Sequence, residues 1–120
     1  MTDSSDDIDA AIRAHAWMDF SIVSASPVAV VVHGTLDEAV EIALTFEDAE
    51  YLEAPLSWRT DTAQPVFSEV SGDEARTRNL RYGSTHGHRL FRFTCEDEGF
   101  AYISARWVRL TQRAASPRAT

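Results

Sequence analysis

The stretch RLFRFTCEDEGFAYISARWVRL, residues 89–110, decides the fold. Phe91, Phe93 and Cys95 alternate with polar residues, which is the period-two pattern of a strand with one buried face. A short acidic connection then ends in Gly99, and a second apolar run follows it. The sequence therefore predicts a β-hairpin at 89–110.

The return strand of this hairpin carries apolar residues on both faces. Strict alternation places one set on the first face: Ala101, Ile103, Ala105 and Trp107. It places a second set on the other face: Phe100, Tyr102 and Val108. Such a strand lies in the centre of a sheet or between two layers. We therefore expect the return strand to be internal.

Further strands are predicted on the N-terminal side of the hairpin. Met18, Phe20 and Ile22 alternate with polar residues, and residues 28–33 form a β-branched run. The less regular stretch 56–70 fits one short edge strand at 66–70.

Residues 38–54 permit two interpretations. Their apolar residues alternate with others at four successive positions: Val40, Ile42, Leu44 and Phe46. This alternation predicts a strand, whereas a capping box of Thr35 and Glu38 and the content of Ala, Glu and Leu favour a helix. We predict a strand, with a bulge near Glu47 and Asp48, because the apolar positions change from even to odd there.

A helical period at 5–16, with aspartates in the first turn, predicts an N-terminal helix. The polar segment 71–88 is a long loop or contains a short helix at 73–80. The predicted fold class is α+β: a short N-terminal helix and about six mainly antiparallel strands in a curved sheet, sandwich or small barrel. We expect one domain at 5–110, with disordered ends at 1–4 and 111–120.

Composition excludes several classes of function. The chain has 120 residues and one cysteine, so it forms no internal disulfide. All 11 basic residues are arginine, which excludes Schiff-base and P-loop lysine chemistry and fits a GC-rich bacterial genome. No apolar run approaches the roughly 20 residues of a membrane span, and the acidic N-terminus does not fit a signal peptide. We expect a cytoplasmic protein without a cofactor.

Charge is divided unevenly along the chain. Residues 1–74 hold two arginines and 16 acids, a net charge of 2 − 16 = −14. Residues 75–120 hold nine arginines and three acids, a net charge of 9 − 3 = +6. This asymmetry fits a partner-binding face, but we favour cross-strand pairing of early acids with late arginines. The absence of a recognition motif argues against nucleic-acid binding.

Three groups of residues are candidate sites. The first is an acidic face for a basic partner: Glu47, Asp48, Glu50 and Glu53, with Trp58 as an aromatic anchor. The second is an aromatic-lined pocket for a small molecule: Trp17, Tyr102 and Trp107, again with Trp58. The third is a metal pair, His86 and His88, for which the sequence places no third ligand. Cys95, on an apolar face, is interpreted as a core residue.

The residues favour a non-enzymatic protein-interaction module, of which a bacterial toxin-neutralising (immunity) protein is one kind. One alternative is a small-molecule-binding or metal-dependent enzymatic β-fold. The other is a self-assembling structural protein, in which an exposed strand pairs with a second copy.

Overall fold

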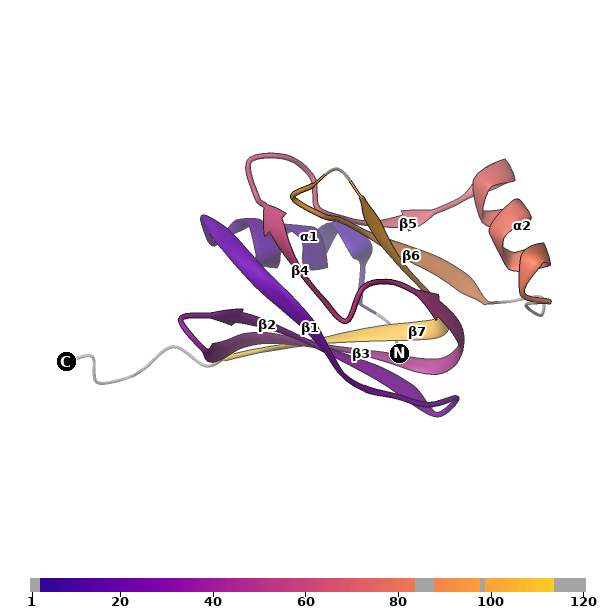
Figure 1. Ribbon diagram of the computed structural model, residues 1–120, viewed down its shortest axis with the longest axis horizontal. Helices are drawn as coiled ribbons and strands as arrows, with labels where there is room; N and C mark the ends of the chain where they lie inside the picture. Colours follow the sequence, from indigo (N-terminus) through magenta and orange to yellow (C-terminus); the bar gives the residue numbers. More distant parts are fainter. Residues whose placement is uncertain (1–2, 84–87, 98, 114–120) are drawn as a thin grey trace.

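The computed structural model describes residues 3–83, 88–97 and 99–113. In this part of the chain the helices are α1 (Ser5–Arg13) and α2 (Gly72–Arg81). The strands are β1 (Trp17–Ala25), β2 (Ala29–Leu36), β3 (Ala39–Glu53), β4 (Ser57–Asp61), β5 (Phe67–Val70), β6 (Arg89–Thr94) and β7 (Phe100–Gln112). They form one antiparallel sheet in the order β4-β1-β2-β3-β7-β6-β5, which curls into a half-barrel (Figure 1). The predicted α+β fold with a curved sheet is confirmed.

The predicted hairpin forms β6 and β7, and β7 lies inside the sheet, between β3 and β6. Residues 101–105 are all buried, because one face of β7 contacts the core and the other lies on the side of the sheet where α2 packs. The strand continues through Gln112, two residues beyond the expected limit of the domain. Residues 114–120 of the expected tail lie outside the described residues.

Strands β3 and β7 bend together, and the bend turns the side chain of Trp107 away from its predicted face. Trp107 is 40% exposed, whereas Val108 is fully buried. The interpretation that Trp107 shares a face with Ala105 is therefore wrong. Asp48, beside the bend on β3, has a left-handed φ of 55°. The buried positions on both strands change phase there, so that Trp107 faces outward.

Segment 39–53 is a strand, as its alternation predicts. Of the two residues that suggested a helix cap, Thr35 is a paired residue of β2 and Glu38 lies in the β2–β3 turn, where Asp37 and Glu38 have φ values of 50° and 69°. Two successive left-handed residues make a tight hairpin turn and end any helical path. The register of β3 against β7 shifts between Ala49 and Tyr51, close to the expected bulge.

Strand β4 was not predicted. It pairs with β1 in the register Asp19 opposite Arg59, and it turns Trp58 and Thr60 into the core. Only two of its positions face inward, and one of them is polar. The Thr60 hydroxyl is nevertheless satisfied, because it donates to the Met18 carbonyl at 3.3 Å.

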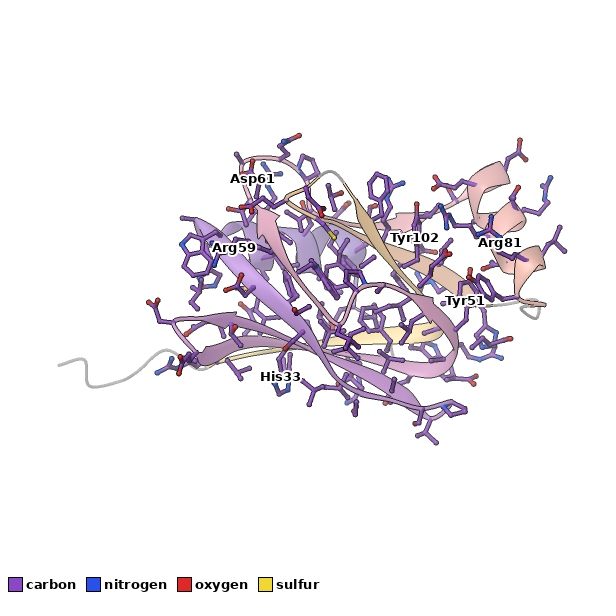
Figure 2. All side chains as sticks on the ribbon, viewed as in Figure 1. His33, Tyr51, Arg59, Asp61, Arg81 and Tyr102 are labelled. Atoms are coloured by element: carbon purple, nitrogen blue, oxygen red, sulfur yellow. The ribbon has the colours of Figure 1, made fainter. Side chains whose placement is uncertain are left out.

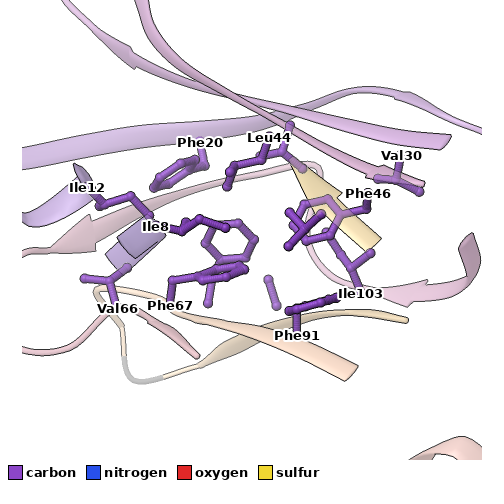
Figure 3. Close-up of a cluster of buried hydrophobic side chains, with 14 of the residues drawn as sticks. Ile8, Ile12, Phe20, Val30, Leu44, Phe46, Val66, Phe67, Phe91 and Ile103 are labelled. Atoms are coloured by element: carbon purple, nitrogen blue, oxygen red, sulfur yellow. The ribbon is translucent and has the colours of Figure 1, made fainter. Parts of the chain in front are cut away.

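The core fills the concave side of the sheet, and Ile8 and Ile12 of α1 are part of it (Figure 3). Ser4 caps α1 by accepting from the backbone N–H groups of Asp6 and Asp7 at 3.1 and 3.2 Å. Ile8 and Ile12 are fully buried against the phenylalanines of the sheet. In the described part of the chain, no helix is long and apolar enough to span a membrane.

Candidate functional site

Two acids of the acidic face predicted from the sequence, Glu47 and Asp48, are paired with arginines of β7. Arg109 donates to Glu47 at 3.0 Å, and Arg106 donates to Asp48 at 2.7 Å. The hydrogen bond from Arg106, together with its positive charge, holds the pKa of Asp48 below its ordinary value. Acids of the N-terminal part therefore lie beside arginines of the C-terminal part, which confirms the predicted cross-strand pairing.

Glu53 belongs to a polar network that holds α2 on the sheet. It accepts hydrogen bonds from Arg78 at 2.6 Å and from the Tyr82 hydroxyl at 3.1 Å. Tyr51 stacks on Tyr82 with ring centroids 4.2 Å apart and donates to Asn79 at 2.7 Å. Burial raises the pKa of Tyr51 to about 12, so its hydroxyl stays a donor at neutral pH.

The aromatic residues of the predicted pocket lie in separate places. Tyr102 is buried beneath α2, where the Arg78 guanidinium lies 3.8 Å from the centre of its ring (Figure 2). Trp17 lies beside Arg59 at 4.6 Å, on the face of β1 opposite the core, and Trp107 is exposed on β7. Trp58, only 7% exposed, points into the core. The structure does not bring the four together.

His88 is buried beside two carboxylates. Its side chain is 5% exposed, with Nδ1 3.0 Å from Glu50 and Nε2 3.8 Å from Asp48. His86, its predicted partner in metal binding, lies outside the described residues. Within residues 3–83, 88–97 and 99–113, no group of three or more His, Cys, Asp or Glu side chains is placed to hold a metal ion.

Cys95 is a core residue, as predicted. It is 7% exposed and belongs to the main apolar cluster. Burial, and then the negative charge of Asp97, raises the pKa of the thiol to about 11. The thiolate is the nucleophilic form of cysteine, so this side chain is poorly suited to nucleophilic catalysis at neutral pH.

A second group of acids, which sequence reasoning did not single out, surrounds two adjoining hollows at the edge of the sheet. One hollow lies between β4 and the β6–β7 connection, with Trp58, Glu96 and Asp97 in its wall. The other extends from Cys95 and Glu96 to Asp61 and contains Phe100. The Glu96 N–H donates to the Arg59 carbonyl at 2.7 Å, which ties the two sides together.

We call Asp61, Glu96 and Asp97 the edge acids. They have no ion-pair partner among the described residues. Figure 2 shows Asp61 and Arg59 projecting from β4. Asp61 is distant in sequence from the other two acids, so only the curl of the sheet brings them to one site.

Comparisons with protein-family models, with curated proteins and with solved structures found no match. The functional argument therefore rests on the geometry of this chain.

Proposed function

We propose that the protein is a non-enzymatic interaction module whose acidic surface binds a basic protein partner. A toxin neutralised by its immunity protein is a partner of this class. One observation supports the proposal above others: the ten arginines of the described residues all form ion pairs with acids of the same chain. Positive charge is therefore neutralised locally, while part of the negative charge is not.

The acids without an ion pair among the described residues are concentrated in three places. Asp6 and Asp7 lie at the start of α1, and Asp37 and Glu38 lie at the β2–β3 turn. The third place is the hollows at β4, with Asp61, Glu96 and Asp97. Unpaired carboxylates attract a basic partner and accelerate its association without first breaking internal contacts. A paired carboxylate such as Glu47 would have to give up the arginine of its own chain before it could bind one of the partner.

The proposal is tested by capturing partners from a native lysate at low and high salt, with variants that remove equal charge. One triple variant is Asp61→Asn, Glu96→Gln and Asp97→Asn. The matched control neutralises three paired acids: Glu47→Gln, Asp48→Asn and Glu53→Gln. We expect a basic protein whose capture weakens at high salt and falls mainly in the first variant.

Two results would contradict the proposal. The first is a captured partner of acidic net charge. The second is capture that neither salt nor any of these variants alters. If only the control variant loses the partner, the acidic face predicted from the sequence is the binding surface, and the edge acids are not.

A further inference from the structure

Helix α2 is attached to the sheet differently from α1. Helix α1 places Ile8 and Ile12 in the core, and its first turn is capped by the Ser4 hydroxyl. Helix α2 stands apart from that core (Figure 1); it buries none of its own residues, and its N-cap, Ser71, forms no side-chain cap hydrogen bond. Packing of an apolar face provides most of the stability of a helix in a protein, so α2 lacks the main force that holds α1.

Polar side chains make the contacts between α2 and the sheet. At the C-terminal end of the helix, Arg78 donates to Glu53 of β3 at 2.6 Å. Nearer its start, Glu74 accepts from the Tyr102 hydroxyl at 2.9 Å and from Arg92 at 3.4 Å. The side chains of Arg78, Glu53 and Glu74 are partly exposed even with α2 in place. Water can therefore replace these contacts, and each contributes little net free energy to holding the helix.

A glycine with a left-handed backbone stands at each end of α2. Gly72, the first residue of the helix, has a φ of 71°, and Gly83, just beyond its last turn, has a φ of 65°. Apart from chain neighbours, no described atom lies within 4 Å of the place that a Cβ would take at either glycine. Glycine changes its backbone angles at little steric cost, and residues at the ends of an element commonly serve as hinges. Both ends of α2 are therefore free to turn.

Helix α2 covers a second apolar cluster, which is separate from the main core. The buried members of this cluster come from β5, β6 and β7: Val70, Leu90 and Tyr102. Ala75 of α2 packs against them, and the Arg78 guanidinium lies 3.8 Å from the centre of the Tyr102 ring. Movement of α2 would take this cover away, while the main core on the other face of the sheet would keep its contacts.

We propose that α2 is a hinged lid. It turns on Gly72 and Gly83 as one unit while the sheet stays folded, and its opening uncovers the cluster of Val70, Leu90 and Tyr102. The polar contacts between α2 and the sheet set the balance between the closed and open states. The lid thus conceals an apolar surface that the fold can present without unfolding. Such a lid does not depend on the proposed function, because it opens without a partner.

Thiol labelling with 5,5′-dithiobis(2-nitrobenzoate) measures the opening. Cys95→Ala removes the native thiol, and Val70→Cys then places one beneath α2. The matched control in the same background is Val32→Cys, because Val32 is fully buried in the main core. We expect the thiol at position 70 to react at least about a hundredfold faster than the one at position 32. Low concentrations of urea should leave its rate unchanged, whereas the rate at position 32, which requires global unfolding, should rise steeply. Equal rates or equal urea dependence would overturn the lid.

Variants of two paired acids on β3 separate lid opening from the residual access of position 70. Glu53→Gln weakens a contact that exists only in the closed state, so it should raise the labelling rate about tenfold. Glu47→Gln weakens the pair with Arg109 of β7, which the closed and open states both keep, so it should leave the rate unchanged. An equal effect of the two variants, or no effect of Glu53→Gln, would overturn the lid.

The hinge has its own variant. Alanine is strained at a left-handed φ, so Gly83→Ala should disfavour the closed state and raise the labelling rate about fivefold. An unchanged rate would show that the backbone at Gly83 does not turn when α2 moves.

Hydrogen exchange of the wild-type protein gives a second measurement that needs no substitution. The amides of α2 should exchange together, faster than those of β7, and at a rate that low urea does not change. Exchange of α2 only together with β7 would mean that the helix opens by global unfolding, and the lid would be wrong. A gradient of rates from the ends of α2 inward would show fraying in place and would also contradict movement of the helix as one unit.

Discussion

The acids of β3 and the edge acids have the same chemistry and opposite surroundings. Glu41, Glu47 and Asp48 each meet an arginine of the C-terminal segment, at distances of 2.7 to 3.0 Å. The edge acids form no ion pair among the described residues, although the charge of Glu96 helps to raise the pKa of Arg59. The difference follows from topology, because β3 lies along β7, whose arginines project beside it, whereas β4 is an edge strand (Figure 1). Acids beside an arginine-bearing strand stabilise the fold, and acids at an edge remain available to a partner.

Removing a core ring should have the largest effect on stability, and it should disturb both regions that are compared. Phe93 contacts both Trp58, in the wall of the hollow, and Phe46, on β3. Phe93→Ala should lower the free energy of unfolding by about 3–5 kcal/mol, because it leaves a cavity in the core. Chemical denaturation measures this loss. Phe100→Ala, at the exposed mouth of the hollow, is the control and should cost much less; equal losses would contradict the placement of the two rings.

Removing a paired charge should have the next largest effect. Glu53→Gln keeps the shape of the side chain but weakens its bonds with Arg78 and Tyr82. We expect a loss of about 1–2 kcal/mol, discounted for partial exposure. Hydrogen exchange should accelerate in α2, which buries none of its own residues. Glu96→Gln is the control, and an equal loss in that variant would show that pairing does not distinguish the two acids.

Low pH should remove the contribution of the Asp48–Arg106 pair to the free energy of unfolding. The pKa of Asp48 is lowered in the folded state, so its contribution is present above the ordinary value of 3.8 and is lost as pH falls through the folded value. The difference in unfolding free energy between the wild type and Asp48→Asn should therefore shrink toward low pH. Denaturation curves between neutral pH and about pH 2 measure it. A difference that stayed constant would contradict the pair.

Neutralising the edge acids should have the smallest effect on stability. The variant Glu96→Gln with Asp97→Asn should change the free energy of unfolding by no more than about 0.5 kcal/mol. Relief of the repulsion with Asp61 and loss of the attraction between Glu96 and Arg59 oppose each other, and both should be smaller at high salt. Thermal unfolding at two salt concentrations measures it. Clear destabilisation would reveal an internal partner for one of these acids.

Much of the sheet was predictable because alternation is a local signal. The hairpin 89–110 and the strand at 39–53 follow from it directly. Strand β4 lacks this signal, since only Trp58 and Thr60 face inward. The outward position of Trp107 also could not be predicted, because it depends on a bend shared with β3, whose register no local pattern gives.

The candidate site was predictable only in part. The charge asymmetry of the sequence indicated that early acids pair with late arginines, and the structure shows these pairs. The same pairing neutralises the acidic run that the sequence made conspicuous. The edge acids gave no sequence signal, because Asp61 reaches Glu96 only when the curl of the sheet brings β4 to the β6–β7 connection.

The position of β7 has a consequence for the order in which the chain folds. The ribosome makes β7 after the other described strands of this sheet, yet β7 lies between β3 and β6. Strands β1 to β4 are neighbours in the sheet and form a first block, while β5 and β6 form a second. The two blocks can join into one sheet only when β7 emerges, so the edge of β3 stays open until then. Such late, long-range pairing is slow and exposes nascent chains to aggregation.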